Sequence, residues 1–290
     1  MSLALVLLLG HLAALAFGLA GLLVALPHPE WWAGDPTAVR VFAFGMTYGG
    51  ATHIILGAAA VFAFGWVTFG PRRVGIFLVV STTLSLASEV IGTGTGWPFG
   101  NYEYTSFLGA KILDRVPFTI PLSWFYMGLS CSVLGRLIAV RFGKWGPWWA
   151  LALGVWLLTA WDLVLDPAMA DPGLRVQFWT WHETGPYFGM PLQNLAGWSL
   201  TGLAYMGLSR LLWGAEIEPA ALAPAGWFPF AVYAANLAFA VALSLSAGLW
   251  PSVVLAVLTG LLPASLAVSA SRLRPRRPFG EVGWRASPGR

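Results

Sequence analysis

Eight long apolar runs, separated by short segments with Pro, Gly and charged residues, constrain this chain more than any other feature. A helix that crosses about 30 Å of hydrocarbon needs roughly 20 mostly apolar residues. The runs predict helices of this kind over residues 2–26, 38–69, 73–91, 118–140, 147–166, 190–213, 227–247 and 251–270, of which the last two also fit one helical hairpin. We therefore expect an all-α, polytopic transmembrane helix bundle with about eight spans.

The runs leave no room for a separate soluble domain. We expect one transmembrane helical domain over residues 1–271 and a basic cytoplasmic tail over residues 272–290. The first run carries no charge and has no Lys or Arg ahead of it. A cleaved signal peptide normally begins with a positive segment, so this run is interpreted as a retained span.

The basic residues predict the orientation of the bundle. Twelve of the sixteen Lys and Arg residues lie at or after the ends of even-numbered spans, and only four lie beside odd-numbered spans. Cytoplasmic loops carry the excess of Lys and Arg, so both termini are expected in the cytoplasm of a multi-pass cell-membrane protein. The same bias accounts for a pI near 9.5, and no nucleic-acid partner is expected.

Two long connections, residues 92–117 and 167–189, then fall on the non-cytoplasmic side. Both are dense in Gly, Trp, Tyr and Pro rather than in the polar residues of a disordered linker. Long aromatic loops usually cover a site or bind a ligand. We expect these two loops to cap the bundle.

A few acids interrupt the apolar runs. Asp162 and Asp166 stand four residues apart in "WDLVLDP", so they share one face of the predicted helix. Glu89 closes the third run and Asn194 opens the sixth, at the same predicted side of the membrane. Charge inside a membrane costs at least about 2.5 kcal/mol per residue, so such groups usually face a cavity and mark function. His53, which has no partner at helical spacing, is interpreted as a packing residue.

Several other chemistries do not fit the sequence. Four widely spread histidines do not form the clustered boxes of a di-iron oxygenase, and no metal site or cofactor is expected. Both lysines lie outside the predicted spans, which excludes a retinal Schiff base. "GTGTGWPFG" has no Gly-Lys-Ser/Thr ending, and no Gly-x-Ser-x-Gly elbow occurs. Cys131 is the single cysteine, so no intramolecular disulfide can form.

After these exclusions, the chemistry that still fits the sequence is acid catalysis in an apolar cavity. Two carboxyl groups in a site of low dielectric cannot both ionise easily, so one stays protonated near neutral pH. Such an acid can protonate an electron-rich double bond to give a tertiary carbocation, which aromatic faces and a remaining carboxylate stabilise. Addition of water to the cation completes a hydration.

Long motifs around these residues carry a family resemblance. "EVIGTGTGWPFGNYEYT", "KILDRVPFTIPLSWF", "WDLVLDPAM" and "WTWHETGPYFGMPLQNLAGW" resemble the signature blocks of the carotenoid 1',2'-hydratase family, which includes γ-carotene, lycopene and bisanhydrobacterioruberin hydratases. The resemblance implies addition of water across the C1'-C2' double bond of a ψ-end group without a cofactor. It also implies a lipid-dissolved carotenoid as substrate, either lycopene, γ-carotene or a C50 carotenoid, and other enzymes of the carotenoid pathway as partners.

The chemistry assigns expected roles to individual residues. Asp162 or Glu89 is the expected proton donor, and Asp166 is the partner that keeps the donor protonated or receives the proton of water. The remaining expected site residues line the end-group pocket or hold water: Trp161, Trp124, Trp181, Trp198, Tyr102 and Tyr104 for the pocket, and Asn194, Glu103 and His182 for water. Glu183 is interpreted as an interfacial loop residue. Two alternatives stay open, a lycopene-type carotenoid cyclase that uses the same protonation and a carotenoid- or lipid-binding transporter.

Overall fold

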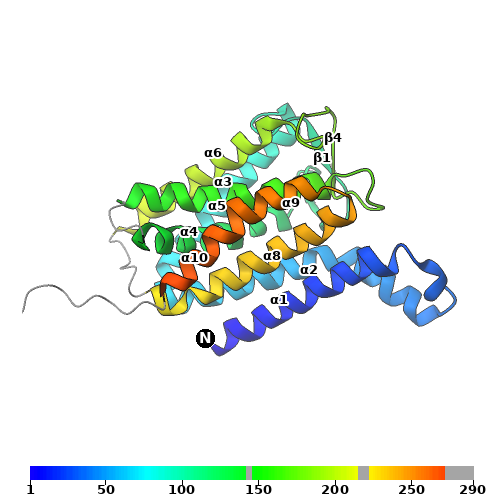
Figure 1. Cartoon of the computed structure of the whole chain (residues 1–290), viewed down its shortest axis with the longest axis horizontal. Coiled ribbons are helices and arrows are strands. Elements are labelled where there is room, and N and C mark those ends of the chain that lie inside the picture. Colours follow the sequence, from blue (N-terminus) through cyan, green and yellow to red (C-terminus); the bar gives the residue numbers. More distant parts are fainter. Residues whose placement is uncertain (142–145, 215–221, 272–290) are drawn as a thin grey trace, which may run out of the picture.

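The computed structural model describes residues 1–141, 146–214 and 222–271, and the basic tail of residues 272–290 lies outside them. The helices of this part form a bundle of roughly parallel and antiparallel rods (Figure 1). The long helices are α1 (Ser2–Ala20), α2 (Pro36–Phe69), α3 (Pro71–Thr95), α4 (Thr119–Arg141), α5 (Pro147–Met169), α6 (Leu192–Trp213) and α8 (Trp227–Ser246). The last rod combines α9 (Trp250–Ala256), the π-helix Val257–Leu261 and α10 (Leu262–Ser271). Shorter pieces are the π-helix Gly21–Ala25 and the 3-10 helices Pro29–Trp31 and Ala223–Ala225.

The predicted spans are confirmed as helices. Within the described residues, seven helical segments are long and apolar enough to cross a membrane. The eighth expected span, α6, is 22 residues long and packs against α3 and α5, but it is not among the seven. Its buried face carries polar side chains, including Asn194, Thr201 and Ser209, which make it less apolar without moving it out of the bundle.

The outside of the bundle is apolar and several of its buried groups are polar. Leu9, Val67 and Leu211 are more than half exposed, whereas Glu89 and Asp162 are buried. A water-soluble protein rarely has this distribution, because exposed apolar side chains are unfavourable in water and favourable in lipid. The chain is a multi-pass membrane protein.

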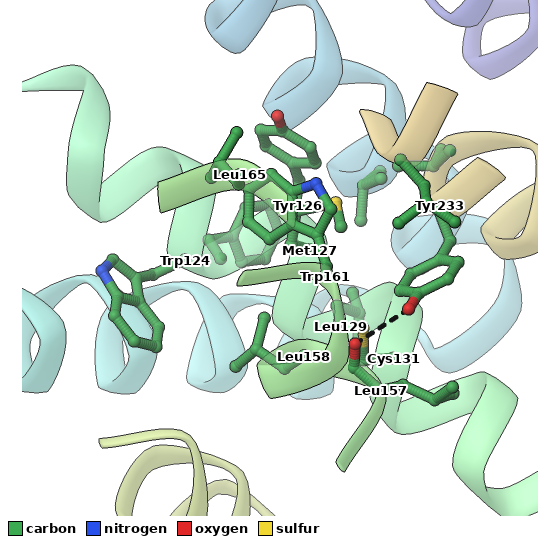
Figure 2. Close-up of a cluster of buried hydrophobic side chains, with 14 of the residues drawn as sticks. Trp124, Tyr126, Met127, Leu129, Cys131, Leu157, Leu158, Trp161, Leu165 and Tyr233 are labelled. Carbon is green, nitrogen blue, oxygen red and sulfur yellow. Dashed lines mark hydrogen bonds between the residues drawn. The ribbon is translucent and has the colours of Figure 1, made fainter. Parts of the chain in front are cut away.

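The interior is filled where α4, α5 and α8 meet (Figure 2). Trp124 and Leu129 of α4 lie among Leu158 and Leu165 of α5, and the hydroxyl of Tyr233 on α8 donates to the Leu157 carbonyl at 2.9 Å. The backbones of α4 and α5 approach closely at Gly135, where an added Cβ atom would lie 2.5 Å from the Gly154 nitrogen. Small residues at such crossings are typical of helix packing in membranes.

The two aromatic loops meet and cover one end of the bundle, as expected. Strand β1 (Tyr102–Tyr104) of the first loop pairs antiparallel with β4 (Trp179–Trp181) of the second. This ribbon lies at the end of the bundle opposite to the N-terminus and to the end of α10 (Figure 1). Within the first loop, β2 (Lys111–Ile112) pairs with β3 (Val116–Pro117).

Helix α5 extends further than the sequence indicated. It continues through Pro167 to Met169, beyond the predicted end at residue 166. Proline has no N–H to donate to the carbonyl four residues earlier, which is that of Leu163. The hydroxyl of Tyr187, from the second loop, donates to this carbonyl at 2.9 Å. Burial raises the pKa of Tyr187 to about 12, so its hydroxyl keeps its proton at neutral pH.

The close crossing of α4 and α5 gives a stability prediction. We expect Gly135→Ala to lower the free energy of unfolding by about 1–3 kcal/mol. The new methyl group clashes with backbone atoms, which cannot change rotamer to relieve the clash. Thermal unfolding in detergent measures the effect. The matched control is Gly75→Ala on α3, where no atom lies within 4 Å of the new Cβ. Equal unfolding midpoints for the two variants would contradict the prediction.

Candidate active site

A cavity of about 750 Å³ lies beneath the β1–β4 ribbon. Side chains of α2, α3, α4, α5, α6 and α8 and of both loops surround it. Its lining includes nine of the predicted site residues, namely Glu89, Tyr102, Tyr104, Trp124, Trp161, Asp166, Trp181, Asn194 and Trp198. Residues from distant parts of the sequence are thus brought to one place.

Glu89 forms the first acidic group of the cavity. One carboxylate oxygen accepts hydrogen bonds from the hydroxyls of Tyr102 and Tyr104, the latter at 2.9 Å, and the other accepts from the indole N–H of Trp124 at 3.0 Å. Three donors thus point to the two oxygens of this buried carboxyl group, an arrangement that favours its charged form over a carboxylate without donors. Burial, followed by the charge of Glu89, raises the pKa of Tyr102 and of Tyr104 well above the usual value, so both phenols remain donors.

Asp162 and Asp166 form the second acidic group. Both are buried, and the side-chain amide nitrogen of Asn194 donates to Oδ2 of each, at 3.0 Å to Asp162 and 2.5 Å to Asp166. Two carboxyl groups that share one amide nitrogen lie close together, and Oδ1 of Asp162 is buried with no hydrogen-bond partner among the described residues. Two carboxylates this close in a site of low dielectric cannot both ionise easily, which favours one proton on the pair. Asp166 lines the cavity, whereas Asp162 lies behind it.

The acids are not neutralised by basic side chains. Among the described residues that line the cavity there is no Lys or Arg. Negative charge in a site of low dielectric strongly favours a positive charge nearby, because the attraction is little screened. This cavity is therefore suited to stabilise a cation brought or formed by a ligand.

Aromatic rings form most of the remaining wall. Trp124 stacks on Trp198 with ring centroids 4.1 Å apart, and Trp161 meets Trp198 edge-on at 5.7 Å. Aromatic faces stabilise cations as well as apolar groups. The indole N–H groups of Trp161 and Trp181 are buried and have no hydrogen-bond partner within the described part of the chain. Each is available to a polar atom that enters the cavity.

Comparison with known proteins agrees with these features. The family model of carotenoid biosynthesis proteins matches residues 49–263, a range that contains all three acids and Asn194. The chain belongs to this family. A bisanhydrobacterioruberin hydratase from Haloarcula japonica is 36% identical over 133 residues, which are 45% of this chain and 43% of that relative. The match thus spans less than half of the length of the relative, and no solved structure matches the chain.

Three predicted site residues do not line the cavity of this carotenoid biosynthesis protein: Asp162 lies behind it, and Glu103 and His182 lie on the ribbon. Glu103 and His182 are exposed on the outside of the ribbon. Successive side chains of a strand point to opposite faces, so the inward direction of Tyr102 and Tyr104 turns Glu103 outward. His182 follows β4, and its backbone N–H donates to the Asn101 carbonyl. The expectation that these two side chains hold water in the cavity is therefore corrected. Glu183 accepts a hydrogen bond from the Asn101 backbone and lies in the loop, as interpreted.

The sequence analysis missed a second polar group in the cavity wall. The hydroxyl of Tyr126 donates to Oδ1 of Asn236 at 2.8 Å, and Nδ2 of Asn236 lies 3.0 Å from Nε2 of His11. His11 Nδ1 is 2.7 Å from the His53 carbonyl, which connects α1, α2, α4 and α8. His53 also lines the cavity. A single Asn inside the apolar run of α8 was the available signal, but its partners lie more than 100 residues away in sequence.

Asn194 gives a prediction about the stability of the site. We expect Asn194→Leu to lower the free energy of unfolding by about 1–3 kcal/mol, because both aspartates lose a shared donor inside the bundle. Thermal unfolding in detergent provides the measurement. Gln193→Leu is the control, since Gln193 is exposed and donates to a single backbone carbonyl. The prediction fails if the control loses as much stability as Asn194→Leu.

Proposed function

We propose that this chain is a carotenoid 1',2'-hydratase, a hydro-lyase that adds water across the C1'-C2' double bond of a ψ-end group. The observation that supports the proposal is that two aspartates share one amide donor beside a cavity that also holds a separate acid, Glu89, among aromatic rings. The hydratase from Haloarcula japonica, which is similar over part of its length, supports the same reaction class. The substrate is a carotenoid dissolved in the bilayer.

The first step is protonation of the alkene. The shared proton of the aspartate pair leaves through Asp166, because Asp166 and not Asp162 lines the cavity. A C–H bond forms at C2' as the double bond opens, and C1' becomes a tertiary carbocation. This assignment moves the donor from Asp162 or Glu89, the residues expected from the sequence, to Asp166. Asp162 becomes the partner that supplies and holds the proton.

The second step is stabilisation of the cation. In this mechanism Glu89 acts as the anion: three donors hydrogen-bond to its oxygens and it faces the cavity, so its charge lowers the energy of the cation without any rearrangement. The rings of Trp124, Trp161 and Trp198 add their π faces. Because the hydrocarbon brings no counterion, this fixed negative charge is the main electrostatic contribution of the protein.

The third step is addition of water. A water molecule whose oxygen accepts the free N–H of Trp161 or Trp181 keeps a lone pair for attack on C1'. The new C–O bond gives a tertiary alcohol, and the excess proton of the water returns to the aspartate pair. The reaction consumes one alkene and one water and leaves the acids as they began. No electrons are gained or lost overall, so the chemistry requires no redox cofactor.

Carboxamide variants test the acid roles. In a host that accumulates lycopene or γ-carotene, we expect Asp166→Asn to lower hydration by about 10²–10⁴-fold, since loss of a general acid has effects of this size. Asp162→Asn and Glu89→Gln are expected to lower it as well, through loss of the shared proton and of the stabilising charge. Asp114→Asn, in an exposed loop at a backbone φ of 56° that Asn tolerates, is the control. Full hydration by all three site variants, with protein present in the membrane, would refute the mechanism.

The mass of the product separates the alternatives in the same experiment. Hydration adds one water, about 18 Da, whereas a cyclase in which an internal alkene captures the cation leaves the mass unchanged. A transporter leaves the pigment chemically unaltered. The unpartnered indole N–H groups favour hydration, because a cyclisation pocket has no use for a donor to a water oxygen.

We also propose that both termini lie in the cytoplasm and that the β1–β4 ribbon faces the other side of the cell membrane. The N-terminus and the end of α10 lie at the same end of the bundle (Figure 1). Arg72 lies at that end, in the first turn of α3, and Asp114 lies in the loop at the opposite end.

Cysteine labelling in intact cells tests this orientation. Cys131 is buried and its replacement by Ala gives a background without other cysteines. In that background we expect a membrane-impermeant thiol reagent to label Asp114→Cys from outside and to label Arg72→Cys only after the membrane is opened. The reverse pattern would overturn the proposed orientation.

A further inference from the structure

A second cavity of about 640 Å³ adjoins the first. The two share four lining residues: His53, Leu108, Met169 and Phe239. The second cavity lies between α1 and α2 and reaches the π-helix Gly21–Ala25. His53 is the one titratable side chain among its described lining residues, so this space contains no acid for chemistry. It is an apolar extension of the active site.

Glycine residues, which have no side chain, leave the space of this extension unfilled. A Cβ atom added at Gly21 or Gly49 would have no protein atom within 4 Å, which shows that both backbones border empty space. At Gly45, on the same side of α2, an added Cβ would lie 2.9 Å from the ring of Phe17. The extension is therefore a slot whose walls are glycine backbone and aromatic ring. Its π-helical segment is of a kind that often marks functional sites.

We propose that this slot binds the unsaturated hydrocarbon chain of the same carotenoid whose end group lies between the acids. The inference rests on the proposed function and names where the rest of the substrate lies. A ψ-end group continues into a long conjugated chain, which must leave the acid cavity through its wall. The four shared residues border both cavities and three of them are apolar, so the chain would pass among them, and a flat conjugated chain suits a space lined by glycine backbone and phenylalanine rings.

The position of the slot also indicates how the substrate enters. Gly21 and Gly49 are half-buried, and their helices present exposed apolar side chains such as Phe44 and Val24 on the outside. A substrate dissolved in lipid can therefore slide between α1 and α2 from the bilayer. The end group passes His53 before it reaches Asp166.

The test fills the slot without disturbing the fold. Gly49→Leu and Gly21→Leu place a side chain in space that the protein leaves empty, so the thermal unfolding midpoint is expected to stay near that of the unmodified chain. Gly75→Leu on α3 is the matched control, since its Cβ also meets no atom within 4 Å but lies away from both cavities. The full chain is produced in a carotenoid-accumulating host and purified in detergent. The pigment extracted per protein is then measured by absorbance, and lipid is measured in the same extract.

We expect the bound pigment to fall about tenfold or more in Gly49→Leu and Gly21→Leu, the size expected when an inserted side chain overfills a packed site. The control is expected to retain its pigment. Unchanged pigment in both slot variants would overturn the proposal, as would an unmodified chain that purifies without pigment. Loss of phospholipid alone, with pigment retained, would assign the slot to an ordinary lipid chain and also overturn it.

Two further measurements separate this inference from the proposed function. Asp166→Asn is expected to retain pigment while it loses hydration, because the variant leaves the slot intact. An unmodified chain that binds pigment in the slot but never hydrates it would refute the hydratase proposal and leave the slot standing.

Discussion

Burial of carboxyl groups away from water is the constraint on which the active-site end of this bundle depends. A buried charge is tolerated only when hydrogen bonds or an opposite charge replace its hydration. Because no Lys or Arg is among the described residues that line the cavity, hydrogen-bond donors must replace this hydration. Glu89 on α3 takes its donors from β1 and α4, and the two aspartates of α5 share a donor from α6. The acids therefore determine which helices and loops have to meet.

The aromatic loops are part of this arrangement rather than a cover added to it. β1 supplies two of the three donors to Glu89, and its pairing with β4 brings Trp181 over the cavity. The second loop also supplies Tyr187, whose hydroxyl takes the place of the N–H that Pro167 lacks. The helix can therefore continue past Asp166, which keeps that carboxyl inside the protein and away from the helix end.

The helices were predictable because the requirement for length and apolarity acts on each run of the sequence by itself. The acids were predictable for a related reason, since a charged residue in an apolar run is rare enough to be noticed without knowledge of its neighbours. The directions in which side chains point were harder to predict from the sequence. Strand alternation turned Glu103 outward, and nothing in the sequence of the first loop indicated which of its residues would face in. The partners of Asn236 come from α1 and α4, so its network depends entirely on tertiary packing.

The two cavities have different properties, and the proposed function gives each a different role: reaction in the acid cavity and binding of the chain in the slot. The acid cavity has charge, donors and aromatic faces, all suited to a reaction at a single carbon atom. The slot has no acid among its described lining residues and offers glycine backbone, phenylalanine rings and other apolar surface, which suit a long hydrocarbon. A substrate without polar groups can form few hydrogen bonds or ion pairs with an enzyme. Most of the energy of its binding must therefore come from burial of the hydrocarbon chain. Binding that is remote from the reacting bond can then place the end group against Asp166 and Glu89, where the energy is used for the transition state. On the proposed function, the glycine-lined slot and the acids of the cavity together recognise a substrate that is almost entirely hydrocarbon.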